Sequence, residues 1–370
     1  MSVWLNWACL GERSADLGEE ALDTREHELL EALQTCIAWV ARWTGRPAAD
    51  VFLTSSATEA CDVLLRVPLV SDLRWLLTTN HAFGTITDAV NRYNLLLRDS
   101  TQLPLRAAAV DINGFLPLPP ERFTLGFGCA VEQITGGAPA LCVIDHVTSL
   151  HGLRLPIDLL ASDLRNRGCR VIADGSQAVG LWPCPDAFRE PYFACFHKYL
   201  NCPAGTGFGV LERERHTHLP AYVTTLAKTA GVSGSLPTLA AERWIECAAR
   251  LGNVGVSAAC TEAVARLRAL LLRELGSVVA CGFSTHRAYR SQILSMDLSA
   301  IGSPKKIWRQ LESMGYRTRL DGHFVRVSLH HSLTDAHIKR FAAAVKEIAS
   351  PAVMASTGHL CGDRADRLQL

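Results

Sequence analysis

The sequence has no excess charge of either sign, no long apolar run and no recognisable export signal. Its 37 basic and 36 acidic side chains leave a formal net charge of +1. A nucleic-acid-binding domain usually carries a basic excess or a basic stripe, and neither is present. No apolar run approaches the roughly 20 residues that a membrane-spanning helix needs. Because Met1–Trp4 lacks the charged and apolar regions of a signal peptide, we expect a cytoplasmic protein that binds neither nucleic acid nor membrane.

Zinc and thiol redox motifs are also missing, although cysteine is not scarce. None of the 13 cysteines stands in a C-x-x-C pair, which is the spacing typical of such sites. Most of them lie among apolar neighbours, as small buried hydrophobic residues do. We therefore predict no metal site and place most of the cysteines in the interior.

The order of apolar and amphipathic segments predicts an α/β fold. Hydrophobic residues make up 48% of the chain and charged residues 20%, a balance typical of a globular protein with a sizeable core. Short apolar strands alternate with helices, which predicts a mainly parallel central sheet with helices on both faces. The expected strands cover residues 51–54, 75–78, 140–144, 170–173 and 193–196, and the expected helices cover 24–44, 59–65, 87–97 and 156–167.

After about residue 250 the pattern changes to that of a smaller α+β domain. Its expected helices cover residues 257–275, 305–314 and 334–348, and its expected strands cover 293–298 and 324–329. We expect a large domain over residues 15–250, a small domain over 251–352 together with 1–14, and a frayed tail over 353–370.

Two segments about twenty residues apart contain the strongest chemical signal. Asp174 begins the run Asp-Gly-Ser-Gln after one buried strand, and Lys198 belongs to His-Lys-Tyr-Leu after the next. Residues beyond the carboxyl ends of parallel strands line the ligand crevice of such sheets. This spacing can bring a carboxylate and an amine into one cleft. Taken alone, Lys198 could be a surface lysine and Asp174 a helix N-cap.

An amine and a buried carboxylate suit pyridoxal 5'-phosphate (PLP). A lysine amine condenses with an aldehyde cofactor to form an imine. The pyridine ring withdraws electrons best when its nitrogen stays protonated, and a neighbouring aspartate holds that proton. The freed lysine can then act as a general base or acid at the substrate.

The phosphate of such a cofactor needs an anion site of its own. Thr54–Ala60 joins a strand to the start of a helix, where backbone N–H groups suit an anion. The alternative is a plain N-capped helix. His81 follows another strand and could lie on the pyridine ring, or could be structural. Gly205–Gly209 lacks the full G-x-G-x-x-G spacing of a dinucleotide loop.

In this order, the segments resemble the class V aminotransferase family of fold-type I PLP enzymes. That family includes cysteine desulfurases, selenocysteine lyases, kynureninases and isopenicillin N epimerase-like proteins. The similarity runs from about Thr24 to Ile348, and Val143–Ser149 is its most specific piece. Further matches are Gly152, Pro156-Ile157, the segment from Asp174 to Gln177, His197-Lys198, Pro203 and Gly205-Thr206-Gly207.

The resemblance implies a role for each matching residue. Lys198 matches the Schiff-base lysine and Asp174 the partner of the ring nitrogen, while Arg326 matches the arginine that binds the substrate carboxylate with a bidentate fork. Arg326 could equally belong to a structural ion pair. The other matched cofactor contacts are Gln177 at the phenolic oxygen, His81 on the ring, and Ala57, Thr58, His197, Cys195 and Ser235 at the phosphate. Relatives often have serine or asparagine at Cys195, and Ser235 would reach the phosphate of a neighbouring subunit, which implies a homodimer.

The reaction remains open among several alternatives. The segment from Arg317 to His323 leads to Arg326 without the cysteine that forms a persulfide in desulfurases. The resemblance therefore favours an enzyme that acts on a small amino acid through an external aldimine, with Cα deprotonation and β-elimination of the C–S lyase type. An aminotransferase, an epimerase and a non-catalytic PLP-binding relative are the alternatives.

Overall fold

A computed structural model gives the structure of the chain. It describes residues 3–4, 26–66, 73–84, 86, 88, 106–212, 238–252, 258–275, 280–281 and 287–356. The chain divides into two compact units, which are described separately. The larger comprises Trp7–Thr261 and Ser284–Ser291, and the smaller comprises Met1–Asn6, Glu262–Phe283 and Gln292–Leu370. The helix predicted over residues 87–97 lies outside the described residues, apart from position 88.

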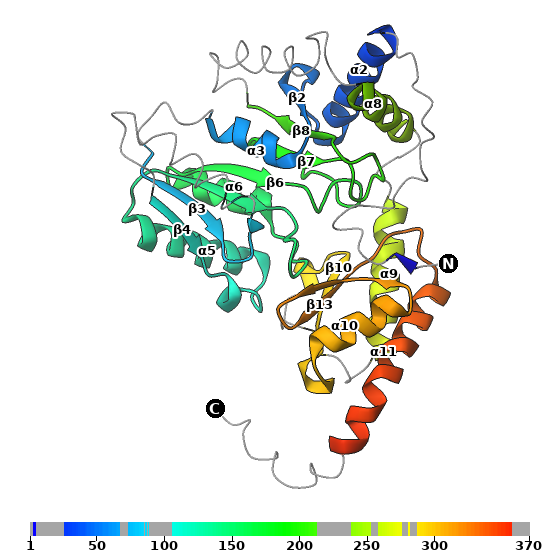
Figure 1. Cartoon of the computed structure of the whole chain (residues 1–370). Coiled ribbons are helices and arrows are strands. Elements are labelled where there is room, and N and C mark those ends of the chain that lie inside the picture. Colours follow the sequence, from blue (N-terminus) through cyan, green and yellow to red (C-terminus); the bar gives the residue numbers. More distant parts are fainter. Residues whose placement is uncertain are drawn as a thin grey trace. The chain divides into compact units, whose positions relative to one another are not determined.

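A seven-stranded sheet in the order β2-β8-β7-β6-β5-β3-β4 forms the centre of the larger unit (Figure 1). Its strands are β2 (Val51–Thr54), β3 (Trp75–Thr79), β4 (Arg106–Val110), β5 (Ala140–Asp145), β6 (Arg170–Asp174), β7 (Tyr192–Cys195) and β8 (Gly207–Val210). The strands from β7 to β4 pair in parallel, and only β8 runs antiparallel to its neighbours. The predicted mainly parallel sheet is confirmed.

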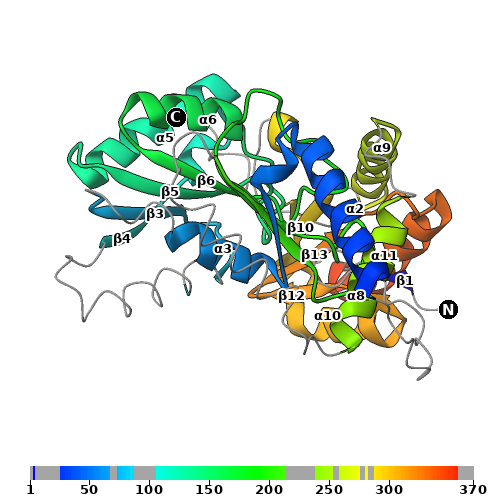
Figure 2. The same cartoon turned by 90° about the horizontal axis from the view of Figure 1, so that it is seen from above.

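Helices cover both faces of this sheet. They are α2 (Glu26–Thr44), α3 (Ala57–Arg66), α5 (Pro120–Thr135), α6 (Ile157–Asn166) and α8 (Thr238–Leu251), with the short 3-10 turns η1 (Ala48–Asp50), η3 (Asn113–Phe115) and η6 (Arg287–Tyr289). Figure 2 shows α5 and α6 on one face and α3 on the other. All residues of β5 are buried, which explains why this strand is a continuous apolar run rather than an alternating one.

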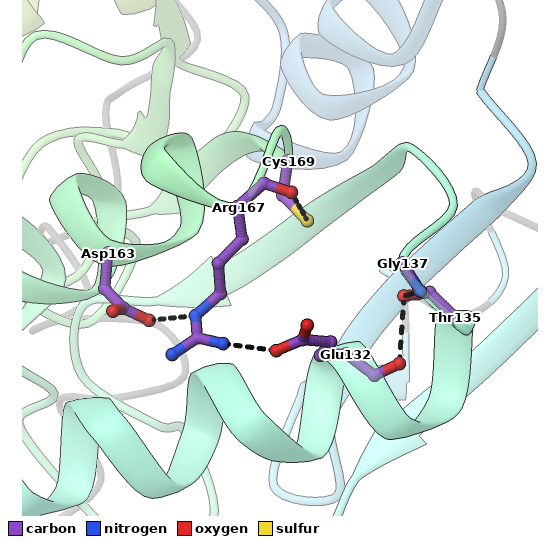
Figure 3. A network of polar contacts seen from close by, with 6 residues as sticks. All are labelled: Glu132, Thr135, Gly137, Asp163, Arg167 and Cys169. Carbon is purple, nitrogen blue, oxygen red and sulfur yellow. Dashed lines mark hydrogen bonds and ion pairs between the residues drawn. The ribbon is translucent and has the colours of Figure 1, made fainter.

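The two helices on the α5 face are joined by an ion-pair network at their ends (Figure 3). The guanidinium of Arg167 donates to Glu132 of α5 at 2.6 Å and to Asp163 of α6 at 2.8 Å. Gly136 ends α5 with a φ of 63°, in the left-handed region where glycine carries no Cβ penalty. These contacts fix α5 against α6 beneath the strands that carry the site.

Residues on the two faces of the sheet enter different cores. Val143, Ile172 and Phe193 pack with apolar residues of α3, including Leu64. Tyr192, one position away from Phe193, instead meets Trp43 of α2 edge-to-face, with ring centroids 5.4 Å apart. Successive side chains of a strand point to opposite faces, so the α3 face carries residues 143, 172 and 193 and their neighbours two positions along.

The smaller unit has an antiparallel sheet in the order β12-β13-β10-β9. Its strands are β9 (Ala280–Cys281), β10 (Ile293–Asp297), β12 (Arg319–Asp321) and β13 (Phe324–Ser328), while β1 (Val3–Trp4) pairs in parallel with β11 (Tyr316–Arg317). Its helices are α10 (Pro304–Ser313), α11 (Asp335–Ser356) and most of α9 (Ala258–Leu275), with η7 (Ser299–Ile301). This confirms the predicted α+β class.

The end of α11 reaches Ser356, four residues into the predicted tail. The proposed domain limits otherwise remain a prediction. Among the described helices, none is both long enough and apolar enough to cross a membrane.

Candidate functional site

Two charged side chains follow neighbouring parallel strands at the carboxyl edge of the large sheet. Asp174 is the last residue of β6, and Lys198 lies shortly after β7 ends at Cys195. In the pairing of these strands, Asp174 lies opposite Phe193. The carboxyl ends of parallel strands form the ligand-binding edge of open α/β sheets. The two segments singled out in the sequence are therefore neighbours in the fold.

The amine and the carboxylate share one electrostatic environment. Burial raises the pKa of Asp174, the positive charge of Lys198 and the hydrogen bond from Ser176 lower it, and the net pKa is raised. Asp174 is 7% exposed, and Lys198 is half-buried. A charge acts strongly on a buried neighbour only at short range. Lys198 therefore lies near enough to Asp174 for its charge to act on the buried carboxyl group.

A tight turn after β6 orients the Asp174 carboxylate. The backbone N–H of Ser176 donates to its Oδ1 at 2.7 Å. A Cβ at Gly175 would collide with the ring and hydroxyl of Tyr192, so the turn requires glycine there. Gln177, on the same turn, is 4% exposed, and its Oε1 accepts a hydrogen bond from the Tyr199 hydroxyl at 3.4 Å. One turn thus places two of the predicted cofactor contacts.

The lysine segment also brings a thiol and an imidazole into this environment. Burial raises the pKa of the Cys195 thiol, but His197 and Lys198 together outweigh it, and the net pKa is lowered. Asp174 acts on the same thiol in the opposite direction. Cys195, His197, Lys198 and Asp174 therefore form one cluster at the ends of β6 and β7.

The start of α3 has the hydrogen bonding of a capped helix. Ser56 Oγ accepts from the N–H of Glu59 at 3.1 Å, while the Glu59 carboxylate accepts from both the N–H and the hydroxyl of Ser55 at 2.7 Å. This resembles a capping box. Within the described contacts, the N–H groups of Ala57 and Thr58 donate to no protein atom. Two donors at a helix N-terminus thus remain available to an anion.

The start of α3 and the charged pair lie on the same face of the sheet. Ala57 packs against the core that contains Ile172 and Phe193. Asp174 follows Ile172 by two positions, and Cys195 follows Phe193 by two, so both point to the α3 face. A Cβ on Gly207 of β8 would lie 3.0 Å from the Ala57 nitrogen. Glycine at this position therefore lets the helix start lie close against the sheet.

His81 follows β3 and is 4% exposed. Its Nε2 lies 2.7 Å from Asn113 Oδ1, and its ring meets the ring of His151 edge-to-face with centroids 4.7 Å apart. Burial lowers the pKa of His81 more than Asn113 and Asp111 raise it, which favours a neutral ring. Because a carboxamide oxygen only accepts, Nε2 carries the proton. Asn113 was missed in the sequence because nothing local links it to a histidine 32 positions away.

Two further residues were predicted from the sequence to contact the cofactor or the substrate. Ser235 lies outside the described residues. Arg326 belongs to the smaller unit, on β13, where it pairs in register with Ser295 of β10. It is 1% exposed, a burial that arginine seldom reaches. Its role toward a substrate therefore remains a prediction.

The chemistry of the cluster fits PLP. Lys198 would supply an amine for the aldehyde, Asp174 a buried carboxylate for the ring nitrogen, and His81 a flat neutral ring. Ala57 and Thr58 would supply two backbone donors for the phosphate. The close approach of Gly207 to Ala57 holds those donors at the face where Asp174 and Cys195 point.

Comparison with known proteins yields an epimerase and cysteine desulfhydrases among the curated relatives. No protein-family model matches the chain. Isopenicillin N epimerase of Amycolatopsis lactamdurans is 27% identical over 253 residues, which cover 59% of this chain and 62% of the epimerase. A putative L-cysteine desulfhydrase of Oryza sativa subsp. japonica is 25% identical over 175 residues, covering 43% of this chain and 34% of that protein. The similarity thus spans less than two thirds of each of these curated relatives.

Solved structures agree on the fold over nearly the whole chain. The cystine C–S lyase C-DES, solved with its product cysteine persulfide, has a TM-score of 0.74 at 14% identity, with 94% of this chain and 97% of the lyase covered. A C-DES variant with glycine linked to its PLP cofactor has a TM-score of 0.75 at 14% identity, covering 94% of this chain and 96% of the variant. The resemblance to class V, fold-type I PLP enzymes is confirmed. These enzymes include a lyase and an epimerase, and the reaction of the present chain is a separate question.

Proposed function

We propose that this protein is a PLP-dependent enzyme that eliminates a sulfur-containing β-substituent from a small amino acid. The observation that carries the proposal is the buried Asp174 carboxyl group under the charge of the half-buried Lys198 at the carboxyl edge of a fold-type I sheet. When bound, PLP supplies an electrophilic carbonyl carbon and an electron sink for charge that develops at the substrate Cα.

Residues of the chain itself would bind the cofactor and the substrate and transfer the proton. The N–H groups of Ala57 and Thr58 bind the phosphate. Asp174 holds a proton at the ring nitrogen, and its hydrogen bond from Ser176 keeps the carboxylate oriented. The free amine of Lys198 would take the proton from Cα and pass it to the sulfur that leaves Cβ. Arg326 grips the substrate carboxylate through its guanidinium fork.

The hairpin before Arg326 supports elimination over persulfide-forming desulfuration. Arg319–Asp321 forms β12, which pairs directly with β13 at positions 324–326. The turn between the strands is therefore tight, and no cysteine stands in it. The segment before Arg326 is therefore too short to form a mobile loop that accepts sulfur on a cysteine. The C–S lyase among the structural relatives supports the same choice.

A first experiment tests the cofactor. Purified protein is mixed with PLP, reduced with borohydride, digested and examined by mass spectrometry. We expect a pyridoxyl adduct on the peptide with Lys198 and a visible absorption band before reduction. Lys198→Ala should lose both, whereas Lys306→Ala, at an exposed position on α10, should keep both. An unmodified Lys198 peptide in the wild type would refute the proposal.

A second experiment tests the reaction. Cysteine, cystine and cysteine conjugates are supplied, and pyruvate, ammonia and released sulfur are measured. We expect all three products from at least one of these substrates. Solvent deuterium at Cα without loss of the β-substituent would identify an epimerase instead, and an amino-group transfer to a keto acid would identify an aminotransferase. Either result would overturn the elimination while leaving the PLP site intact.

A further inference from the structure

A second buried carboxyl group lies beside Asp174. Asp145 is the last residue of β5, and it is the register partner of Asp174 on the adjacent parallel strand β6. Register partners in a parallel pair point to the same face of the sheet. Asp145 is 2% exposed and Asp174 is 7% exposed. The sequence marked Asp145 only as part of a specific motif and assigned it no role.

The two carboxyl groups differ in their hydrogen bonding. Asp174 Oδ1 accepts from the Ser176 N–H at 2.7 Å. Asp145 Oδ2 is buried, and among the described residues it has no hydrogen-bond partner. An ionised carboxylate without partners is costly in the interior, and the group usually takes up a proton instead. Asp174 thus has a hydrogen-bond donor that stabilises its ionised form, whereas Asp145 Oδ2 has none among the described residues.

The surroundings of Asp145 on balance favour its protonated form. Burial and then the negative charge of Asp174 raise the pKa of Asp145 well above its usual range, and the hydrogen bond from its own backbone and the charge of Lys198 lower it only in part. His146, the next residue, hydrogen-bonds the Tyr192 hydroxyl at 3.0 Å, on the other face. Burial and then the charge of Arg154 lower the pKa of His146 to about 3, so its ring is neutral. His81 beyond β3 is also held neutral by burial.

We propose that Asp145 is the protonated member of a carboxyl pair with Asp174, so that the pair presents one negative charge to Lys198 and the ring nitrogen of PLP. Asp145 is thus a positioning residue, because it acts through Asp174. Its proton prevents a second negative charge from building up beside that of Asp174. Part of this inference, the link to the ring nitrogen, rests on the proposed function. The protonated pair itself does not.

The pair can be tested on the full-length chain without PLP by infrared spectroscopy. At neutral pH we expect the wild type to show a carbonyl band of a protonated carboxylic acid. This band should be missing from the spectrum of Asp145→Asn. The Asp158→Asn spectrum, which changes a carboxylate on α6, should keep it. In Asp174→Asn the band should titrate at a lower pH, because the charge that raises the pKa of Asp145 has been removed. A neutral-pH spectrum in which Asp145→Asn changes no acid band would overturn the proposal.

Unfolding of the same variants gives an independent measurement. Since the folded protein holds the Asp145 proton more tightly than the unfolded chain, stability from this group is present below the unfolded value of about 3.9 and is lost as pH rises through the folded value. The folding equilibrium constant of the wild type should fall by up to about tenfold per pH unit in that window relative to Asp145→Asn. Equal slopes for both proteins would contradict the proposal.

The cofactor experiment separates the two proposals. A protonated Asp145 in a chain that never binds PLP would leave the pair standing and remove the proposed function. PLP bound to Lys198 in a chain without the acid band would support the proposed function and overturn the protonated pair. With PLP bound, nitrogen-15 labelling of the ring should show a protonated ring nitrogen in the wild type and in Asp145→Asn, and loss of that proton in Asp174→Ala. Loss of the ring-nitrogen proton in Asp145→Asn would contradict the proposed role of a neutral Asp145, because asparagine is also neutral.

Discussion

Replacing Gly207 by alanine should damage the contact between β8 and the start of α3. The new Cβ would lie 2.6 Å from the carbonyl carbon, 2.9 Å from the oxygen of Ser56 and 3.0 Å from the nitrogen of Ala57. Ordinary contact begins at 3.4 Å, so the helix start must move by about 0.8 Å. All three atoms are backbone, so no side chain can rotate away. Overpacking of this kind costs about 1–3 kcal/mol.

The same shift should weaken cofactor binding. The N–H groups of Ala57 and Thr58 lie on the turn that must move, and a hydrogen bond to a charged group contributes about 1.5–3 kcal/mol. A displacement of this size lengthens such a bond beyond its usual range of about 2.7–3.2 Å. We therefore expect PLP to bind roughly ten- to a hundredfold more weakly to Gly207→Ala.

Two assays separate these effects. Urea unfolding of the PLP-free protein measures the loss of stability, and titration with PLP, followed by absorbance, measures the dissociation constant. Gly114→Ala is the control, because its Cβ would meet nothing within 4 Å, and we expect its stability to stay within about 0.5 kcal/mol of the wild type. If Gly207→Ala matched this control in both assays, the close packing of β8 on α3 would not be what places the phosphate donors.

Three further substitutions test other parts of the site. His146→Asn should flatten the acid side of the plot of stability against pH. Burial lowers the pKa of His146 in the folded protein to about 3, so the stability that the neutral ring contributes is present above the unfolded value of about 6.5 and is lost as pH falls. The folding constant of the wild type should change by up to about tenfold per pH unit in this range. An unchanged profile from pH 6 to 4 in urea titrations would count against a neutral His146. Ser56→Ala removes the cap of α3 and should cost about 0.5–2 kcal/mol in thermal unfolding, and no loss would show that Glu59 and Ser55 suffice. Asn113→Asp places a charge beside His81 and should raise its pKa, measured by NMR titration, whereas a lower value would refute the contact.

The sequence alone was enough to predict the framework of this protein. The strands predicted over 140–144 and 170–173 are apolar apart from Arg170, as expected for strands of a parallel sheet buried on both faces. The helix over 26–44 has a regular amphipathic period. Asp174 and Lys198 could be paired in advance because parallel strands end at one edge. Local pattern and a general rule of sheet topology were sufficient for these parts.

Strands β8 and β4 were not predicted from the sequence, because their residues are not typical of strands. β8 begins in a glycine-rich run, and glycine is depleted in strands. β4 is mostly alanine and largely exposed, so it shows neither the burial nor the branched residues of a typical strand. In both cases pairing with neighbours decides the structure, and a single segment does not show its neighbours.

Only the tertiary structure could reveal the residues that surround the predicted pair. Asp145 stands 29 positions before Asp174, yet strand register places them side by side. Asn113 meets His81 because η3 turns back toward the end of β3. Burial, which no local pattern measures, then decides which carboxyl group keeps its proton. Chain chemistry names the reactive groups, but the order and register of the sheet set the distances through which their charges act.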